Sequence, residues 1–562
     1  MRRTAAAVLA MLAGSCGSSE AVDAHSVVLV TLDTTRTDAL DSFGGTRGVA
    51  PRLDALARES VRYLEARTVA PLTLPAHASM FTGLYPPALG VRANGPACLS
   101  EEATTVAERA AAAGYQTAGF VGGLSLDRAW GAAQGFQTWT QPVESELRVL
   151  GAISDRPAGE VVDDALRWFS ARDRSRPFFL WVHVFDAHAP YLAPEPYLSR
   201  ARGSPYYAEV ARADEALGRL FDALGVDGFF ESGFTCVVAD HGEALGEHGE
   251  DTHGLHLWDS TLRVPFFVRY AGGERAGEES REVVSVVDVG PTLLEAMRLA
   301  PPEGLDGVSL FRRSVPAGRG TYFESLSGWA RFRWSPLCGW IDEHAKYVHG
   351  SKRLTLPRSD PGELQAVEDP RAVERALAGM RKALARPPLE SRALARGPNR
   401  AVAELGYGDA GEFEPDYPDP LAPCDLPSPD ERLQEYREFT AAQTLNQTQR
   451  SAEAAEKLEK LLASNPASVH ALDELAIALV ETKQWERAVD VLQARAKLPP
   501  DRLSTHQKLV QCYLELGNAA GARTHTLRAL ELLIEAHERR GEPEKAAQYR
   551  RIYDSEVGSP AK

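Results

Sequence analysis

The first half of the chain alternates short apolar runs with longer amphipathic stretches. Apolar runs of strand length fall at residues 26–32, 116–121, 177–184, 234–239 and 265–270. Stretches with helical spacing fall near residues 51–64, 103–113, 161–171 and 206–224. This alternation is typical of a mostly parallel sheet flanked by helices. The pattern therefore predicts an α/β domain over this part of the chain.

Several of the predicted strands end on or close to ionisable residues. Asp33 follows the first run, Asp186 and His188 follow the third, and Asp240 with His241 follows the fourth. Ligands of open α/β sheets gather at the carboxyl ends of the strands, so these side chains are expected to share one cleft. Two carboxylates and an imidazole are suitable ligands for a divalent cation. Each aspartate taken singly is more often a turn residue.

The segment of residues 73–86 carries the clearest local signal. Pro75 suits the first turn of a helix and Gly83 suits its end, which places Thr73 at the amino end of a helix. Amide groups at such an end bind tetrahedral anions. A hydroxyl there can attack a phosphoryl or sulfuryl centre if a metal lowers its pKa. The alternative is that Thr73 only caps the helix.

The C-terminal part of the chain has a different pattern. Residues 351–431 are rich in Pro, Gly and charged residues without a steady period, which predicts a linker. Small residues then recur at Ala454, Ala488 and Ala522, and both intervals are 34 residues (488 − 454 and 522 − 488). This spacing resembles the tetratricopeptide repeat and predicts an α-helical repeat domain over residues 432–553. Such repeats are compatible with a surface that binds a protein or peptide partner.

The N-terminal segment resembles an export signal. Arg2 and Arg3 precede an apolar run and then small residues that lead to Cys16. We expect residues 1–20 to be a lipoprotein-type signal, with export to the cell envelope or periplasm and a lipid anchor to the membrane at Cys16. Leu12 stands one place further from the cysteine than that pattern prefers. A plain secretory signal and an uncleaved membrane anchor are the alternatives.

Charge and cysteine content exclude several classes of function. A net charge of −16 argues against nucleic-acid binding, which depends on clustered Lys and Arg. The cysteines after Cys16 are widely spaced and form no CxxC pair, so neither a disulfide framework nor a thiolate metal site is expected.

Taken together, the motifs resemble the sulfatase family of the alkaline-phosphatase superfamily over residues 25–350. Within that family, the chain resembles sulfatase-like proteins that end in tetratricopeptide repeats. The blocks that carry the resemblance are residues 30–38, 73–86, 178–191, 240–249, 262–265, 288–294 and 305–310. The resemblance implies an alkaline-phosphatase-like α/β fold and an anionic ester substrate. It also implies roles for single residues: metal ligands Asp33, Thr73, Asp240 and His241, with Thr73 also the nucleophile, and substrate contacts from Asn94, His188 and His253, the two histidines also acting as acid and base.

The chain departs from authentic sulfatases at its nucleophile. Those enzymes oxidise a Cys or Ser to an aldehyde, whereas Thr73 cannot be oxidised in that way, and His77 replaces the expected arginine. His241 replaces an oxygen ligand, which favours manganese or zinc over calcium. We expect one ion, although Asp186 with His188 and His253 is an alternative second site. His248 and His256 lie close to His253 in sequence and are alternatives for its role.

Three functions follow from this set of residues. The favoured one is a phosphodiester or phosphonate ester hydrolase, or a phosphoryl transferase, that acts through Thr73. The second is a true sulfuric ester hydrolase. The third is an inactive sulfatase-like scaffold that binds proteins through its repeats.

Overall fold

The computed structural model describes residues 25–94, 97–142, 156–311, 315–389, 417–539 and 543–558. The predicted signal segment and Cys16 lie outside these ranges, so the expected lipid anchor stays a prediction. Within the described ranges, no helix has the length and apolar character needed to cross a bilayer.

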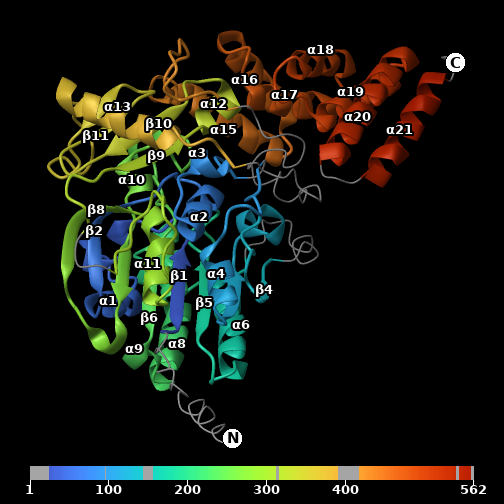
Figure 1. The fold of residues 1–562 in the computed structure, drawn as a ribbon. Coiled ribbons are helices and arrows are strands. Elements are labelled where there is room, and N and C mark those ends of the chain that lie inside the picture. The colour runs from blue at the N-terminus through green and yellow to red at the C-terminus, as the bar shows by residue number, and fades with distance from the viewer. Residues whose placement is uncertain are drawn as a thin grey trace, which may run out of the picture.

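One large mixed sheet forms the centre of the N-terminal domain, with strand order β4-β3-β5-β1-β6-β7-β2-β8 (Figure 1). All neighbouring strands from β4 to β6 are parallel, and β7 runs antiparallel between β6 and β2. The predicted mostly parallel sheet is therefore confirmed. Its strands are β1 (Val27–Leu32), β2 (Val61–Arg67), β3 (Gln116–Val121), β4 (Thr138–Thr140), β5 (Phe178–Val184), β6 (Phe234–Ala239), β7 (Phe266–Arg269) and β8 (Glu279–Ser285).

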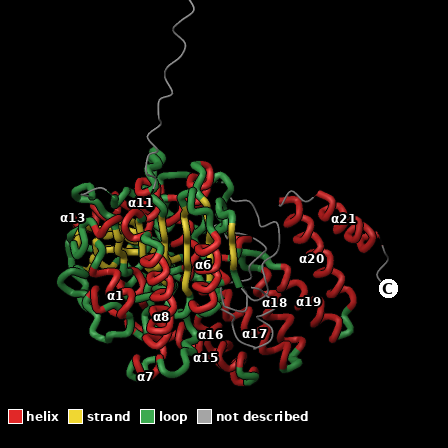
Figure 2. The backbone as a smooth tube through the Cα atoms, turned by 90° about the horizontal axis from the view of Figure 1, so that it is seen from below, coloured by secondary structure: helices red, strands yellow, loops and turns green. Residues whose placement is uncertain are grey.

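Helices cover both faces of this sheet, as Figure 2 shows. One face carries α1 (Pro51–Arg58), α6 (Ala158–Ala171) and α8 (Pro205–Val226), and the other carries α2 (Thr73–Thr82), α4 (Val106–Ala112) and α11 (Val289–Ala296). Shorter helices lie in the connections: α3 (Pro86–Leu89), α7 (Tyr197–Arg200), α9 (Phe229–Ser232), α10 (Asp259–Leu262) and α12 (Ser327–Phe332). The predicted α/β architecture is confirmed.

The register of the central strands places their polar ends side by side. Leu32, the last residue of β1, pairs with Val184 of β5 and Ala239 of β6. All three strands are buried along their whole length because layers of helices cover both faces. The residues that follow them therefore emerge together at one edge of the sheet.

One predicted helix is too long. The stretch at residues 51–64 forms α1 only as far as Arg58, and β2 begins at Val61. Val61 and Tyr63 are buried while Arg62 and Leu64 are half-buried, so the local period changes from helix to strand. Because apolar residues continue through the segment, the sequence pattern did not show where the helix ends and the strand begins. Strands β4 and β8 also lie outside the predicted set.

The predicted linker begins with ordered structure. A second sheet has the order β12-β11-β10-β9. Strand β12 follows residue 350, where the linker was expected to begin, and it pairs with β11, which precedes that residue. Helix α13 packs against β9, β10 and β11. Apolar positions in α13 such as Ala372, Ala376 and Met380 are buried there, although they are too sparse to mark the segment in sequence. These elements are β9 (Thr321–Ser325), β10 (Leu337–Ile341), β11 (Lys346–Val348), β12 (Arg353–Thr355) and α13 (Pro370–Leu384).

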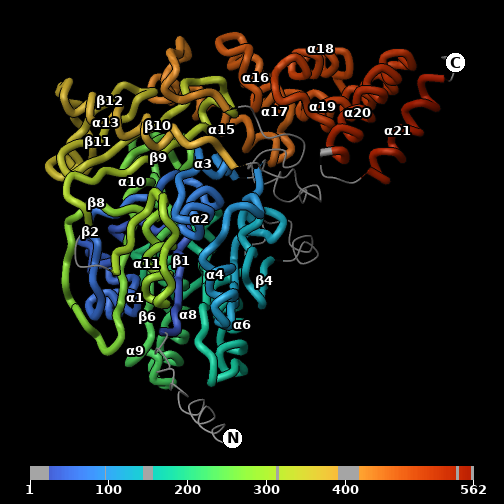
Figure 3. Tube along the Cα trace, in the orientation of Figure 1, coloured from blue at the N-terminus to red at the C-terminus, as the bar shows by residue number. Residues whose placement is uncertain are grey.

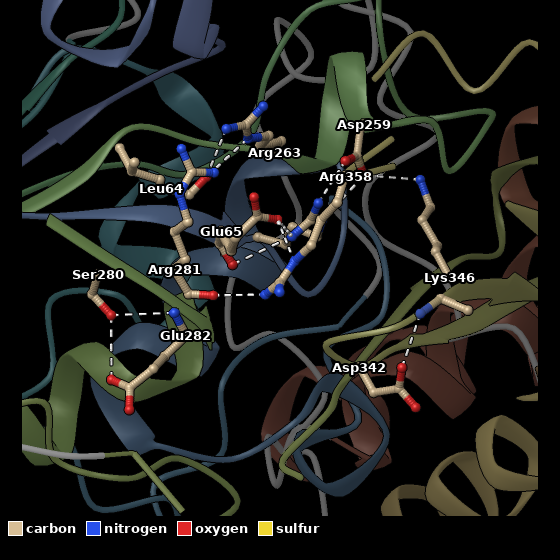
Figure 4. A network of polar contacts seen from close by, with 12 residues as sticks. Leu64, Glu65, Asp259, Arg263, Ser280, Arg281, Glu282, Asp342, Lys346 and Arg358 are labelled. Atoms are coloured by element: carbon tan, nitrogen blue, oxygen red, sulfur yellow. Dashed lines mark hydrogen bonds and ion pairs between the residues drawn. The ribbon is translucent and has the colours of Figure 1, made fainter. Parts of the chain in front are cut away.

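A buried network of charges joins the two sheets (Figure 4). The Lys346 ammonium of β11 lies 3.0 Å from Asp259 and 2.9 Å from Glu363. Arg67 of β2 binds the same Asp259 over 2.7 Å and Glu65 over 3.1 Å. Every member is buried, so each charge depends on its partners to offset lost hydration.

The C-terminal part is a helical region in which each helix packs against the next. It extends away from the sheets as a row (Figure 3), and the predicted helical domain is confirmed at this level. The assignment to tetratricopeptide repeats stays a prediction. The helices are α15 (Leu433–Gln447), α16 (Ser451–Ser464), α17 (Val469–Glu481), α18 (Trp485–Ala496), α19 (Leu503–Glu515), α20 (Ala519–Arg539) and α21 (Pro543–Gly558).

Candidate active site

Three buried ligand groups meet at the carboxyl edge of the large sheet. Asp33 follows β1, and Asp240 with His241 follows the neighbouring β6. One ligand atom from each side chain lies within 4.8 Å of the others. These three side chains are therefore close enough together to hold one cation.

The donor set fits a divalent cation. Asp240 Oδ1 accepts hydrogen bonds from the backbone amides of Thr34 and His241, at 3.2 and 2.7 Å. Asp240 Oδ2 and His241 Nε2 are buried and, among the described residues, have no hydrogen-bond partner. Burial lowers the pKa of His241 to about 3, so its ring is a neutral ligand, and burial raises the pKa of Asp240. A cation between these atoms would supply the missing partner.

Thr73 lies beside this cluster. It is the first residue of α2, its hydroxyl is buried, and Oγ1 donates a hydrogen bond to Asp33 Oδ2 over 3.3 Å. Gly83 ends the helix in the left-handed conformation, as predicted. Asn94 Oδ1 accepts a hydrogen bond from the Leu74 amide at 2.8 Å, and its Nδ2 is buried with no partner among the described residues. Asn94 Nδ2 is therefore available to an anion at the helix end.

A chain of buried polar contacts fixes the floor of the site. His77 Nδ1 donates to the Thr73 carbonyl at 2.8 Å, so its Nε2 accepts from the Thr31 hydroxyl at 3.0 Å. Thr31 Oγ1 in turn accepts from His183 Nδ1 at 2.9 Å and from Trp181 Nε1 at 2.9 Å. Burial lowers the pKa of His77 to about 4, which keeps its ring neutral. His77 therefore positions the backbone of Thr73 and carries no charge, unlike the arginine it replaces.

The two predicted acid and base residues lie at the rim. The rings of His188 and His253 are 5.2 Å apart, and His253 lies 4.4 Å from the ring of His241. His188 stacks on Phe185 at 4.4 Å, and its Nδ1 donates to the Ala189 carbonyl. Burial lowers the pKa of His188 to about 4 and that of His253 to about 3. Both rings are neutral and able to accept a proton from a reacting group.

Sequence reasoning missed Glu243 as a site residue. Its carboxylate is buried and accepts hydrogen bonds from His253 Nδ1 at 3.1 Å and from the Tyr191 hydroxyl at 2.9 Å. It therefore joins the loop after β5 to the loop after β6. Its place in the segment Asp240-His-Gly-Glu243 was the signal that could have identified it.

Three other residues lie outside the cluster. Asp186 accepts a hydrogen bond from the Ala158 amide at 2.7 Å and pairs with Arg212 at 3.3 Å, so it is engaged at the start of α6. This geometry gives no support to a second metal at Asp186. His248 stacks on Trp258 at 3.8 Å, and His256 Nδ1 lies 2.9 Å from Asp430. Among the three nearby histidines, His253 is the one beside the metal cluster.

Comparison with known proteins agrees with this geometry. Residues 25–299 match the sulfatase family model. An ulvan-active sulfatase of Formosa agariphila is 28% identical over 331 residues, covering 51% of this chain and 64% of that protein. An uncharacterized sulfatase, YidJ, of Escherichia coli is 24% identical over 422 residues, covering 61% of this chain and 82% of that protein.

Solved structures share the fold. A phosphonate monoester hydrolase of Agrobacterium radiobacter superposes with a TM-score of 0.53 at 21% identity, covering 64% of this chain and 95% of that one. A putative sulfatase of Bacteroides fragilis superposes with a TM-score of 0.53 at 19% identity, covering 66% and 96%. The sequence relatives and these structural neighbours are hydrolases of the alkaline-phosphatase superfamily. Through residues 25–299, this chain is therefore similar to the sulfatase family.

Proposed function

We propose that this protein is a metal-dependent hydrolase or transferase of phosphodiesters or phosphonate esters with Thr73 as its nucleophile. One observation carries the proposal: the buried Thr73 hydroxyl lies 3.3 Å from Asp33 Oδ2, and Asp33 belongs to a cluster of two carboxylates and an imidazole. A threonine hydroxyl that only capped a helix would not need two carboxylates and an imidazole beside it. Intact ligand residues also argue against an inactive scaffold.

The chain's own residues account for the steps of such a reaction. Thr73 Oγ1 attacks the phosphorus, and the bond from phosphorus to the leaving oxygen breaks, which leaves a phosphoryl group on Thr73. His188 or His253, whose rings are neutral, accepts the proton that the Thr73 hydroxyl loses and passes it to the leaving oxygen. The same histidine then removes a proton from water or an acceptor alcohol, which attacks the phosphorus, and returns that proton to the Thr73 oxygen as the bond from phosphorus to Thr73 breaks. Asn94 Nδ2 holds a nonbridging oxygen.

A divalent ion held by Asp33, Asp240, His241 and Thr73 would stabilise the negative charge of the nucleophile and of the transferred group. Manganese and zinc suit a mixed carboxylate and imidazole set better than calcium does. We propose one ion, because Asp186 is engaged by Ala158 and Arg212.

Sulfuric ester hydrolysis is the second candidate. It is favoured by the sequence relatives, which are named as sulfatases. It is disfavoured by Thr73, which cannot form the aldehyde that authentic sulfatases use.

A substrate panel tests the proposal. Full-length protein loaded with manganese or zinc is assayed on an aryl phosphodiester, an aryl phosphonate monoester, an aryl phosphomonoester and an aryl sulfate. We expect the phosphodiester or phosphonate to give the highest kcat/KM, and Thr73→Ala to lower kcat by about 10³-fold or more. Thr82→Ala is the matched control, because its hydroxyl bonds to Ala78 at the far end of the same helix. Faster aryl sulfate cleavage would favour the second candidate, and equal turnover by Thr73→Ala would reject the nucleophile.

We also propose that the protein is exported and anchored through Cys16, and that the helical region consists of tetratricopeptide repeats. The apolar run before Cys16 and the 34-residue interval support these two proposals.

A further inference from the structure

The loop of residues 247–257 carries His253 and packs against the helical region. We call it the His253 loop. Its Leu255 is buried in the same hydrophobic cluster as Phe439 of α15. Side chains of α15 also cover Gly249, because the nearest of their atoms lies 3.1 Å from the position that a Cβ there would take. The catalytic loop and the first helix of the helical region therefore share one packed core.

A buried ion pair joins the His253 loop to the segment that leads into the helical region. His256 Nδ1 lies 2.9 Å from Asp430 Oδ1, just before α15 begins, and the His256 side chain is buried. Burial alone would lower the pKa of His256, but the bond to Asp430 and the nearby Glu250 carboxylate raise it above its usual value. The contact is therefore charge-assisted at and below about pH 6.5.

Glu250 connects these contacts inside the loop. Its carboxylate is fully buried, and Oε1 accepts hydrogen bonds from the backbone amides of Leu255 and His256, at 2.7 and 3.4 Å. His253 lies between Glu250 and Leu255 in the chain, so these bonds close a turn around it. A displacement of His256 therefore moves the backbone that carries the His253 ring.

We propose that Asp430 is a positioning residue for His253, so that the segment leading into the helical region takes part in catalysis. This proposal rests on the proposed function and gives its proton transfer to His253. Asp430 holds His256 through the ion pair. The turn closed by Glu250 passes this restraint to His253, whose ring is aligned by its hydrogen bond to Glu243. The helical region is thus an element of the active site.

The dependence on the leaving group distinguishes positioning from a general loss of stability. Full-length, zinc-loaded protein is assayed on aryl phosphodiesters whose leaving phenols differ in acidity. We expect Asp430→Asn to lower kcat/KM about tenfold for the poorest leaving group and to change it little for the best, because poor leaving groups depend most on proton donation. Asp430→Glu restores the charge and should recover most of the loss. Asparagine keeps an acceptor for His256, so Asp430→Asn is expected to fold.

A second readout does not depend on turnover. The zinc-loaded protein is labelled with carbon-13 at histidine Cε1, and the NMR signal of His253 is identified by its absence from His253→Gln. We expect Asp430→Asn to shift this signal, because the placement of the ring beside Glu243 changes. Asp425→Asn is the matched control, because Asp425 is an exposed aspartate of the same connecting segment. It should leave both the signal and kcat/KM unchanged.

An equal loss of kcat/KM for every leaving group would overturn the proposal, and so would an unchanged His253 signal in Asp430→Asn. If no ester is turned over but the signal still shifts, the proposed reaction fails and the link from Asp430 to His253 stands. If esters are turned over and Asp430→Asn behaves as the parent does, the positioning role fails alone.

Discussion

His253 Nδ1 donates a hydrogen bond to Glu243 Oε1 over 3.1 Å, and both groups are buried beside the metal cluster. This contact fixes the ring with its Nε2 bare, which is the form that accepts a proton from water and, once protonated, gives it to a leaving oxygen. Tyr191 holds the other oxygen of the same carboxylate at 2.9 Å. Glu243 is therefore a positioning residue for His253.

Glu243→Gln should lower kcat by about 10- to 100-fold, as expected when the partner of a catalytic imidazole is changed. The loss should grow with the pKa of the leaving alcohol, because poor leaving groups depend most on proton donation. KM should change less than kcat. Tyr191→Phe is the control that removes a different hydrogen bond from the same carboxylate. An equal loss for all leaving groups would show that Glu243 only supports the fold of the loop.

Asp240→Asn should abolish the effect of metal on stability. Asp240 Oδ2 and His241 Nε2 lack hydrogen-bond partners among the described residues, so a bound cation satisfies groups that are otherwise buried without partners. Manganese at a hundred times its Kd should stabilise the native chain by about 2.7 kcal/mol, and a chelator should remove that gain. Calorimetric melting with and without metal measures it. A metal-dependent Tm that survives in Asp240→Asn would place the ion elsewhere.

Asp186→Asn should change how the stability of the protein depends on pH. Burial raises the pKa of Asp186 to about 7, against about 3.9 in an unfolded chain. The protonated carboxyl therefore stabilises the fold fully below about pH 4, and this contribution is lost as the pH rises to about 7. A neutral asparagine does not titrate. The free energy of unfolding of the native chain should fall between pH 4 and 7 by about 4 kcal/mol relative to Asp186→Asn.

The metal content of Asp186→Asn should stay at one ion per chain, because the Asp186 carboxylate bonds to Ala158 and Arg212. Elemental analysis of the purified variant and of the native protein measures this. A variant that loses one of two ions would restore the two-metal alternative.

The sequence predicted the parts of the site that depend on strand ends. Asp33 and Asp240 follow long buried apolar runs, so the topology of a parallel sheet was enough to bring them together. Glu243 could not be placed in the same way, because its role depends on a loop that turns back to Tyr191. Asp186 was misleading for the opposite reason: it also follows a buried strand, but it turns toward the first amide groups of α6.

In the fold, too, elements defined by the local sequence pattern were predicted, and elements that depend on distant contacts were not. Long apolar strands such as β5 were found because every residue is buried. Strand β12 and helix α13 were taken for a linker, because both draw their stability from contacts with elements distant in sequence. Lys346 and Glu363, for example, are charged residues that become buried only when they meet each other and Asp259.

Lys346→Met should destabilise the protein by about 3–5 kcal/mol, because it leaves the buried carboxylates of Asp259 and Glu363 without their shared cation. Adding Glu363→Gln removes one of these charges and should restore part of the loss. Chemical denaturation of the native chain, the single variants and the double variant measures the coupling. Additive effects in the double variant would mean that the ion pair contributes no interaction energy of its own.

Phe332→Ala should weaken the attachment of the helical region to the N-terminal α/β domain. Phe332 is fully buried, stacks on Trp334 at 4.3 Å and meets Phe439 of α15 edge-on, so it is shared by both parts of the chain. Truncation of a buried phenylalanine costs about 3–5 kcal/mol, and here the cost falls on the junction. We expect a separate, earlier melting transition for the helical region, read by calorimetry together with limited proteolysis. Phe311→Ala, which alters the core around Tyr270 on the far side of the sheet, should leave that transition in place. A single transition shifted equally by both variants would mean that the two parts unfold as one unit and that Phe332 has no special role between them.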